Sequence, residues 1–172
     1  MTEQTDGLRR LLDRSSLEEL ARRYMRGLDR RDGALLRSVF HPDATTHYGA
    51  FAGGPDEFVD YAMSALSTHE INQHLIGQVN LWFETEVRAN GEVYFTAFHR
   101  LDRQGQRVDM TISGRYVDRY ECREGDWGIS HRTEIVDWAR TEPTLDDYTP
   151  GRPALVLGRP GPQDLSYRID QA

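Results

Sequence analysis

The chain has 172 residues, of which 38% are hydrophobic and 28% charged, and its formal net charge is -7. This composition is typical of one globular domain that can bury a sizeable core, and it excludes a disordered chain. Because a net-acidic chain without a basic run binds a phosphate backbone poorly, we expect no nucleic-acid partner. Cys122 is the only cysteine, which excludes an intrachain disulfide and a zinc site built on several cysteines.

Motifs for membranes, phosphates and metals are absent from the sequence. Residues 1–16 are polar and charged, and the apolar runs elsewhere are too short for a signal peptide or a membrane span. GxGxxG, P-loop and HExxH patterns do not occur, and the spacing of His41, Asp43 and His47 matches no compact set of metal ligands. We therefore expect a cytoplasmic protein with no membrane partner, no cofactor and no metal.

Three helices are predicted in the first part of the chain. Apolar residues recur at helical spacing, and Ser16 followed by Glu19 fits a capping box at the start of the first helix. Pro42 limits the second helix. The helices are expected over residues 15–30, 33–40 and 56–66, with a first strand over residues 44–51.

Four long strand-like stretches follow, and the pattern of the sequence changes with them. They are expected over residues 69–84, 92–102, 108–123 and 127–138. Turn-like residues separate them, and Asn90-Gly91 is a strong hairpin signal. Successive antiparallel strands after three helices predict an α+β domain in which the helices cover one face of a strongly curved sheet.

The composition changes again from Thr141, after which five of the seven prolines fall. We therefore expect a domain over residues 1–140 and a Pro/Gly-rich tail over residues 141–172. The tail is either flexible or docked on the domain or on a neighbouring subunit through apolar residues such as Leu155 and Tyr167.

Two predicted strands carry histidines that could take part in chemistry. Alternation places His74 and Trp82 on one mixed polar and aromatic face, which suits either solvent or a wet pocket. His99 shares an apolar face with Phe95, so it is either a core histidine or a second histidine of a pocket.

Other candidates lie on the first helix, the first strand and the last strand. Asp29 ends the helix beside its apolar stripe, as either a solvated acid among arginines or a buried carboxylate that orients a histidine. Tyr24 lies on the apolar face of the first helix and Tyr48 in the first strand. Most tyrosines at such positions pack in the core, with the hydroxyl bonded to a partner. Arg132 is expected to be exposed, to be paired, with Glu134 as one partner, or to hold an anion in a pocket.

The order of the elements and four segments carry a resemblance to a known family. The segments are YMRGLDRRD, VFHPDA, INQHLIG and ISGRYVDRYECREGDWGISHR. Over roughly residues 12–140 they resemble the SnoaL-like branch of the nuclear-transport-factor-2-like superfamily. The resemblance implies a cystatin-like fold, a cone-shaped α+β barrel with a mostly antiparallel sheet.

The resemblance also implies roles for individual residues. Asp29 and His74 fall where scytalone dehydratase, bile-acid 7-alpha-dehydratase and gamma-hexachlorocyclohexane dehydrochlorinase have an Asp-His dyad. Tyr24 resembles the active-site tyrosine of the bile-acid enzyme, and Arg132 resembles the active-site arginine of the dehydrochlorinase. Tyr48 and His99 fall at intervals similar to the second tyrosine and second histidine of scytalone dehydratase. Tyr48, His99, Trp82 and Phe95 form the expected substrate-binding set.

These roles imply a cofactor-independent lyase, either a dehydratase or a dehydrohalogenase, acting on a hydrophobic cyclic or steroid- or polyketide-like small molecule. His74 is expected to abstract a proton, with Asp29 orienting its ring. The alternatives are an isomerase or polyketide-type cyclase with the same dyad, or a non-catalytic binding module. A homodimer or homotrimer is expected to form through the sheet, because one strand has an apolar set that needs covering. This set is Leu75, Val79, Leu81 and Phe83.

Overall fold

The computed structural model describes residues 2–145, 147 and 149–169. Three helices precede most of the sheet, and they are α1 (Thr2–Arg30), α2 (Gly33–Arg37) and α3 (Pro55–Ser67). The strands are β1 (Phe40–Tyr48), β2 (Phe51–Gly53), β3 (His69–Phe83), β4 (Arg88–Arg103), β5 (Gln106–Arg123) and β6 (Asp126–Pro143). Two short 3-10 turns follow in the tail, at Gly161–Gln163 and Leu165–Tyr167.

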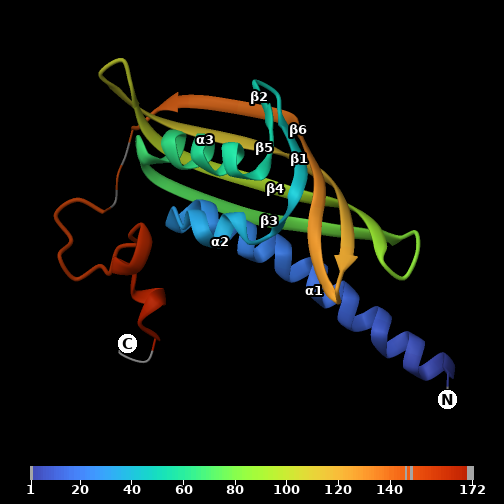
Figure 1. Ribbon diagram of the computed structural model, residues 1–172. Coiled ribbons are helices and arrows are strands. Elements are labelled where there is room, and N and C mark those ends of the chain that lie inside the picture. The colour runs from blue at the N-terminus through green and yellow to red at the C-terminus, as the bar shows by residue number, and fades with distance from the viewer. Residues whose placement is uncertain (1, 146, 148, 170–172) are drawn as a thin grey trace.

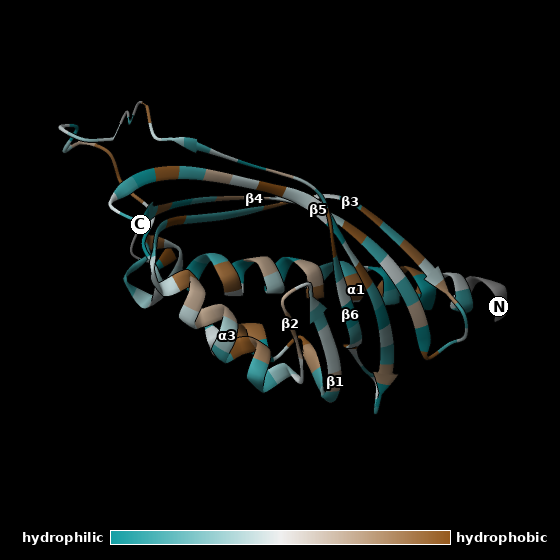
Figure 2. Ribbon diagram, turned by 90° about the horizontal axis from the view of Figure 1, so that it is seen from above, coloured by the Kyte–Doolittle hydropathy of each residue, from teal (hydrophilic) through white to brown (hydrophobic). Residues whose placement is uncertain are grey.

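The six strands form one sheet in the order β2-β1-β6-β5-β4-β3. Only the β1–β6 pair is parallel, and the other neighbours are antiparallel. The sheet curves strongly, and α1 and α3 lie on its concave side (Figures 1 and 2). The predicted α+β class is therefore confirmed, as are the three helices and the mostly antiparallel sheet. The sheet ends in two edge strands, β2 and β3, so it does not close into a complete barrel.

Helix α1 begins well before the predicted capping box. The helix runs from Thr2, and the Ser16 hydroxyl donates a hydrogen bond to the carbonyl of Leu12 at 3.0 Å, a bond made inside a continuing helix. The expected start at residue 15 is wrong, because Ser16 tolerates this back-bond and no residue before it breaks the helix. The additional turns reach the turn between β3 and β4, where the guanidinium of Arg10 lies 4.0 Å from the ring centre of Phe83.

The second helix is shorter than predicted. It ends at Arg37, the Ser38 hydroxyl donates to the carbonyl of Leu35, and Phe40 already begins β1. Phe40 is buried and pairs with Ile129 of β6. The predicted first strand therefore starts four residues too late, and it divides at Gly49, whose φ of +63° makes the turn into β2.

Asn90-Gly91 is not a turn, so the hairpin predicted there is wrong. Both residues lie inside β4, and the connection from β3 falls at residues 84–87. A Cβ at position 91 would lie 2.7 Å from the Tyr120 ring, so packing rather than turn geometry requires this glycine. The two other predicted turns are confirmed, because Gln104 and Glu124 have positive φ and each precedes a glycine with positive φ.

A bulge in β3 changes which residues face the core. Ile76 pairs with Phe95, but Val79 pairs with Val93, so β3 has one residue more than β4 over this interval. The shift turns Leu81 inward, where it is 8% exposed, and turns Trp82 outward, where it is 55% exposed. The expectation that Trp82 shares a face with His74 is therefore wrong.

The same bulge corrects the expected outer apolar set. Val79 and Phe83 pack against the core, as Leu81 does, so only Leu75 of that set remains outside. Other strands add exposed apolar side chains to the outer face, and these include Trp138, which pairs with Ser113. Within the described residues, no helix is both long and apolar enough to cross a membrane.

The tail lies against the C-terminal end of α1 (Figure 1). The hydroxyl of Tyr167 donates to Asp32 at 3.0 Å, and the guanidinium of Arg26 lies 4.6 Å from the ring centre of Tyr167. Asp164 is buried, and its carboxylate accepts the backbone N–H groups of Arg159 and Ser166. Strand β6 continues to Pro143, three residues into the segment expected to be tail.

The crossing of α1 and α2 gives a test of this packing. A Cβ at position 27 would lie 2.9 Å from both the Cβ and the backbone nitrogen of Leu36, whereas a Cβ at position 7 would meet nothing within 4 Å. Gly27→Ala is therefore expected to destabilise the protein by about 1–3 kcal/mol, although alanine favours helices by roughly 1 kcal/mol. Gly7→Ala, the matched control, is expected to be neutral or slightly stabilising. Urea unfolding followed by circular dichroism measures both, and equal stability of the two variants would contradict this packing.

Candidate functional site

Asp29 and His74 are joined by two hydrogen bonds to one oxygen atom. Oδ1 of Asp29 accepts from the His74 ring Nδ1 at 2.8 Å and from the His74 backbone N–H at 2.9 Å. The side chains of His74 and Asp29 are 6% and 17% exposed, so Asp29 is a half-buried carboxylate paired with a histidine rather than a solvated acid among arginines. Because a carboxylate only accepts, Nδ1 carries the ring hydrogen, and Nε2 is left as the basic atom.

A second pair of histidines lies beside this contact, held by Asn72. Its Oδ1 accepts from Nδ1 of His99 at 3.0 Å and from Nδ1 of His69 at 2.8 Å. The amide nitrogen of Asn72 donates to the carbonyl of Leu66, which fixes the orientation of the amide. Both histidines therefore carry hydrogen at Nδ1, and Nε2 of each is an acceptor.

His99 is a neutral histidine inside the domain. It is 6% exposed, and its ring centre lies 5.2 Å from that of His74. Burial, together with the neighbouring His74 and His69, lowers the pKa of His99 to about 3. The sequence left His99 as either a core histidine or a second histidine of a pocket. In the structure it is a core histidine with one hydrogen bond, and it also lies against His74.

Arg132 is buried at the centre of the concave face and pairs with Asp118. Its Nε and Nη2 donate to the two oxygens of Asp118 at 2.7 and 2.6 Å, and the guanidinium lies 4.1 and 4.3 Å from the ring centres of Tyr24 and Tyr116. Burial lowers the pKa of Arg132, but the charge and hydrogen bonds of Asp118, together with Tyr48 and Tyr24, more than reverse this and raise the pKa well above the ordinary value. The expected pairing with Glu134 is replaced by this bidentate pair.

Aromatic side chains surround Arg132 and fill much of the interior. The hydroxyls of Tyr24 and Tyr48 form a hydrogen bond of 2.7 Å with each other, and burial raises the pKa of Tyr24 to about 12. Tyr48 stacks on Phe58 at 4.3 Å, and Phe95 stacks on Tyr116 at 4.5 Å. These tyrosines therefore stay neutral and can donate hydrogen bonds. Among the described contacts, neither Tyr24 nor Tyr48 bonds to the Asp29–His74 pair.

The structure adds one residue to the expected site and removes another. Glu134 is inward, because it pairs directly with the buried Tyr116 across β5 and β6. The sequence already placed Glu134 on the same strand face as Arg132, which was the signal that could have identified it. Trp82 lies on the outer face and does not join the other expected residues.

The cavities of the described residues place Asp29 and His74 at two different openings. Asp29 lines a cavity of about 320 Å³ between the end of α1, the start of β3 and the tail. His74 lines a groove of about 590 Å³ between α1 and β3. The two residues therefore contact each other directly but open onto different hollows of the surface, although one shared cavity would be expected of a catalytic pair.

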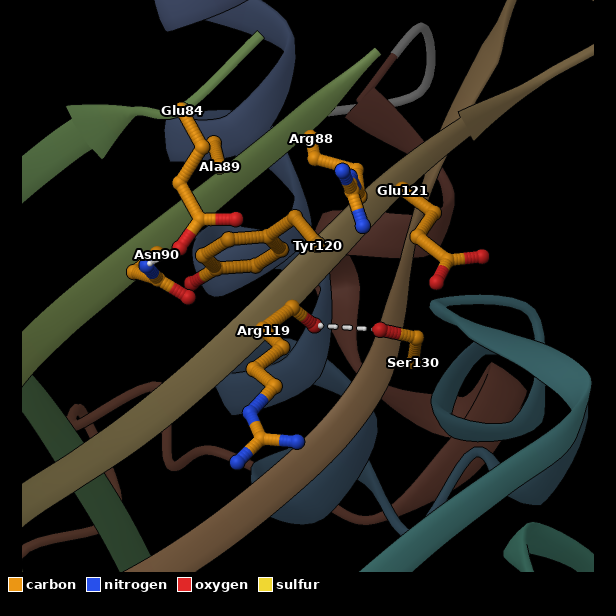
Figure 3. A pocket seen from close by; sticks show the side chains of 8 residues that line it. All are labelled: Glu84, Arg88, Ala89, Asn90, Arg119, Tyr120, Glu121 and Ser130. Atoms are coloured by element: carbon orange, nitrogen blue, oxygen red, sulfur yellow. Dashed lines mark hydrogen bonds between the residues drawn. The ribbon is translucent and has the colours of Figure 1, made fainter.

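A third hollow, of about 570 Å³, lies at the other end of the sheet (Figure 3). There, the amide of Asn90 donates to Glu84 at 2.7 Å, and Ser130 donates to the carbonyl of Arg119 at 3.1 Å. Asn90 pairs with Trp82, eight residues along β3 from His74. No histidine is among the described residues that line this hollow, in contrast to the Asp29–His74 end of the sheet. Within the described part of the chain, no three His, Cys, Asp or Glu side chains are grouped as metal ligands.

The comparisons with known proteins agree with this fold. Residues 9–133 match the SnoaL-like domain, and the chain belongs to that family. A hexachlorocyclohexane dehydrochlorinase, LinA type 2, is 23% identical, with a TM-score of 0.76 over 84% of this chain and 99% of that one. A provisionally named scytalone dehydratase from Novosphingobium aromaticivorans is 20% identical, with a TM-score of 0.69 over 86% and 99%. A Nostoc punctiforme protein of unknown function with a cystatin-like fold has a TM-score of 0.58 at 22% identity, over 73% and 92%.

The burial of neutral His99 predicts a pH-dependent contribution to stability. In the unfolded chain the pKa of a histidine is near 6.5, whereas that of His99 in the folded protein is about 3. The unfolded state therefore binds more protons in this window, and stability is lost as pH falls through it. The stability advantage of the wild type over His99→Gln is expected to shrink by about 1–3 kcal/mol between pH 7 and pH 4.

Urea unfolding at several pH values measures this difference. His47→Gln is the matched control, because it replaces an exposed histidine of β1 in place of the buried His99. A difference between the wild type and His99→Gln that stays constant from pH 7 to pH 4 would show that His99 is not held neutral.

Proposed function

We propose that the protein is a cofactor-independent lyase of the dehydratase or dehydrohalogenase type, with His74 as the base. The observation that carries the proposal is the double hydrogen bond from His74 to Oδ1 of Asp29. The bond from the His74 backbone N–H fixes the position of the residue, and the bond from the ring Nδ1 fixes the tautomer of the ring. A positioned neutral imidazole of this kind is suited to removing a proton from a carbon beside a carbonyl group.

In the proposed reaction, Nε2 of His74 takes the proton and the ring becomes an imidazolium. The carboxylate of Asp29 stabilises this charge at 2.8 Å without itself accepting the proton. General-base catalysis of this type contributes roughly 10²–10⁴ in rate. No metal or redox group takes part in the proposal.

Negative charge that develops on the substrate needs donors, and the interior supplies them. Arg132 keeps its charge through Asp118, and the hydroxyls of Tyr24 and Tyr48 stay protonated. The surrounding aromatic rings favour a hydrophobic cyclic substrate, such as a steroid- or polyketide-like molecule. The names of the similar dehydrochlorinase and dehydratase structures support a reaction of this class.

The same base serves two further reactions. If the proton returns to another carbon, the product is that of an isomerase. If the carbanion instead attacks a carbonyl carbon of the same molecule and the proton goes to the resulting oxygen, the product is that of a polyketide-type cyclase. The Asp29–His74 contact supports these outcomes equally, and release of water or halide distinguishes the lyase from them. A non-catalytic binding module would need no oriented base, so loss of turnover on replacing His74 separates it from all three.

The first functional prediction concerns the pair itself. His74→Ala is expected to abolish turnover, and Asp29→Asn to lower kcat by about 10²–10⁴, because an amide neither fixes the tautomer nor stabilises imidazolium. Turnover is measured by screening cyclic β-hydroxy and β-halo ketones for formation of the conjugated enone. His47→Ala is the control and should keep full activity. A folded His74→Ala variant with wild-type turnover would rule out His74 and make His99 the next candidate.

We also propose that the outer face of the sheet joins two or three copies of the chain. Its exposed apolar side chains come from three strands, β3, β5 and β6, and Leu75 and Trp138 lie in one cross-strand row with Thr96 and Ser113. Such side chains on a sheet face are typical of a contact surface. The members are Leu75, Trp82, Val117 and Trp138.

The assembly is tested by light scattering at micromolar concentration. The wild type is expected to be a dimer or trimer, and Trp138→Glu is expected to shift it towards monomer without changing the circular dichroism spectrum. Tyr61→Glu is the control, because Tyr61 is 46% exposed but lies on α3. A monomeric wild type would contradict the proposal.

A further inference from the structure

Glu134 is an acid on the concave face that the described residues leave without a hydrogen-bond or ion-pair partner. It lies two residues after Arg132 on β6 and directly opposite Tyr116 of β5, which is 2% exposed. Arg132 is itself opposite the buried Asp118, so this stretch of β6 points its alternate side chains inward. The carboxyl group of Glu134 therefore faces the interior rather than the solvent side of the sheet.

Charged and titratable groups from four elements surround Glu134. They are Tyr24 of α1, His74 of β3, Tyr116 of β5 and Arg132 of β6. Burial raises the pKa of Glu134, and the nearby Arg132 and His74 reverse that rise only in part. Glu134 thus faces the same interior as the proposed base and holds a proton more readily than a surface glutamate.

Arg132 has an unused donor in the same region. Asp118 takes its Nε and Nη2, whereas Nη1 is buried with no hydrogen-bond partner among the described residues. The side chain of Arg132 is 1% exposed, so solvent does not readily supply the missing acceptor. A buried donor without a partner costs roughly 1–3 kcal/mol, and an oxygen atom of a bound ligand would remove that cost.

We propose that Glu134 and Nη1 of Arg132 form a subsite for an oxygen atom of the substrate, and that Glu134 is the acid that protonates a leaving hydroxyl group. The inference rests on the proposed lyase function and narrows it to a dehydratase. A halide leaves as a stable anion and needs no proton, but hydroxide is a poor leaving group and requires an acid. With both groups on one concave face, His74 would remove the proton from carbon and Glu134 would protonate the leaving hydroxyl group.

The step balances without any further reactant. Nε2 of His74 removes the proton from the carbon beside the carbonyl, and the electrons of that C–H bond form the new C=C bond. The C–O bond to the hydroxyl group breaks, and the proton of Glu134 passes to the departing oxygen to give water. The enzyme is left with an imidazolium at His74 and a carboxylate at Glu134, and transfer of one proton between them restores both groups.

Two probes that differ only in the leaving group test the inference. Both 3-hydroxycyclohexanone and 3-chlorocyclohexanone give cyclohex-2-enone, which is followed by its ultraviolet absorbance. Glu134→Gln keeps a hydrogen-bond donor but has no proton to transfer. We expect it to lower kcat for the hydroxy probe by about 10²-fold or more, with KM changed little. Its rate on the chloro probe should stay within about threefold of the wild type.

The controls separate this inference from the proposed function. His74→Ala should lose both activities, and Glu142→Gln should lose neither, because Glu142 is an exposed glutamate on the same strand. If Glu134→Gln lowered kcat equally on both probes, Glu134 would have a structural role and would not be the acid. An unchanged rate on the hydroxy probe would overturn the inference while leaving His74 as the base.

If the wild type turns over neither probe, that result counts against the proposed lyase function but not against the subsite. A binding measurement then tests the subsite separately. Dissociation constants for 3-hydroxycyclohexanone and for cyclohexanone are measured by NMR titration. Glu134→Leu should weaken binding of the hydroxy compound by about tenfold and leave cyclohexanone unaffected. Equal affinities of the wild type and Glu134→Leu for the hydroxy compound would overturn the subsite.

Discussion

The contact between Asp29 and His74 joins the end of α1 to β3, and the candidate site depends on it. One carboxylate oxygen binds both the backbone and the ring of the same histidine, so the position of the strand and the tautomer of the base are set together. The carboxylate lies at the C-terminal end of a helix, where the macrodipole disfavours negative charge. The two hydrogen bonds from His74 compensate for this position, which explains why a half-buried acid is stable there.

The interior beyond this contact is organised around a fully buried acid, Asp118. Asp118 holds Arg132 in a bidentate pair, and Arg132 in turn lies between the rings of Tyr24 and Tyr116. Removing either partner of such a pair would leave an uncompensated buried charge, which is strongly destabilising. Asp118 occupies only two of the three guanidinium nitrogens, so Nη1 has no hydrogen-bond partner among the described residues.

Charged and hydrogen-bonding side chains thus lie on one concave face, contributed by different elements. Helix α1 brings Asp29 and Tyr24, β3 brings His74, and β6 brings Arg132 and Glu134. The curvature of the sheet is what allows strands at its edge and near its centre to face a common interior. A flat sheet with the same strand order would spread these side chains along a surface.

The amino-acid sequence determined the class of the fold and most of its elements, and the resemblance to the SnoaL-like family brought Asp29 and His74 together as a pair. Periodicity of apolar residues and positive-φ turns are local signals, and they located the helices and two of the three long hairpins. Tertiary structure decided the rest. The bulge in β3 turned Trp82 outward, the Tyr120 ring rather than a turn required Gly91, and Asp118 rather than Glu134 became the partner of Arg132. Strand register and cross-strand distance control each of these outcomes, and neither is encoded in the alternation of a single strand.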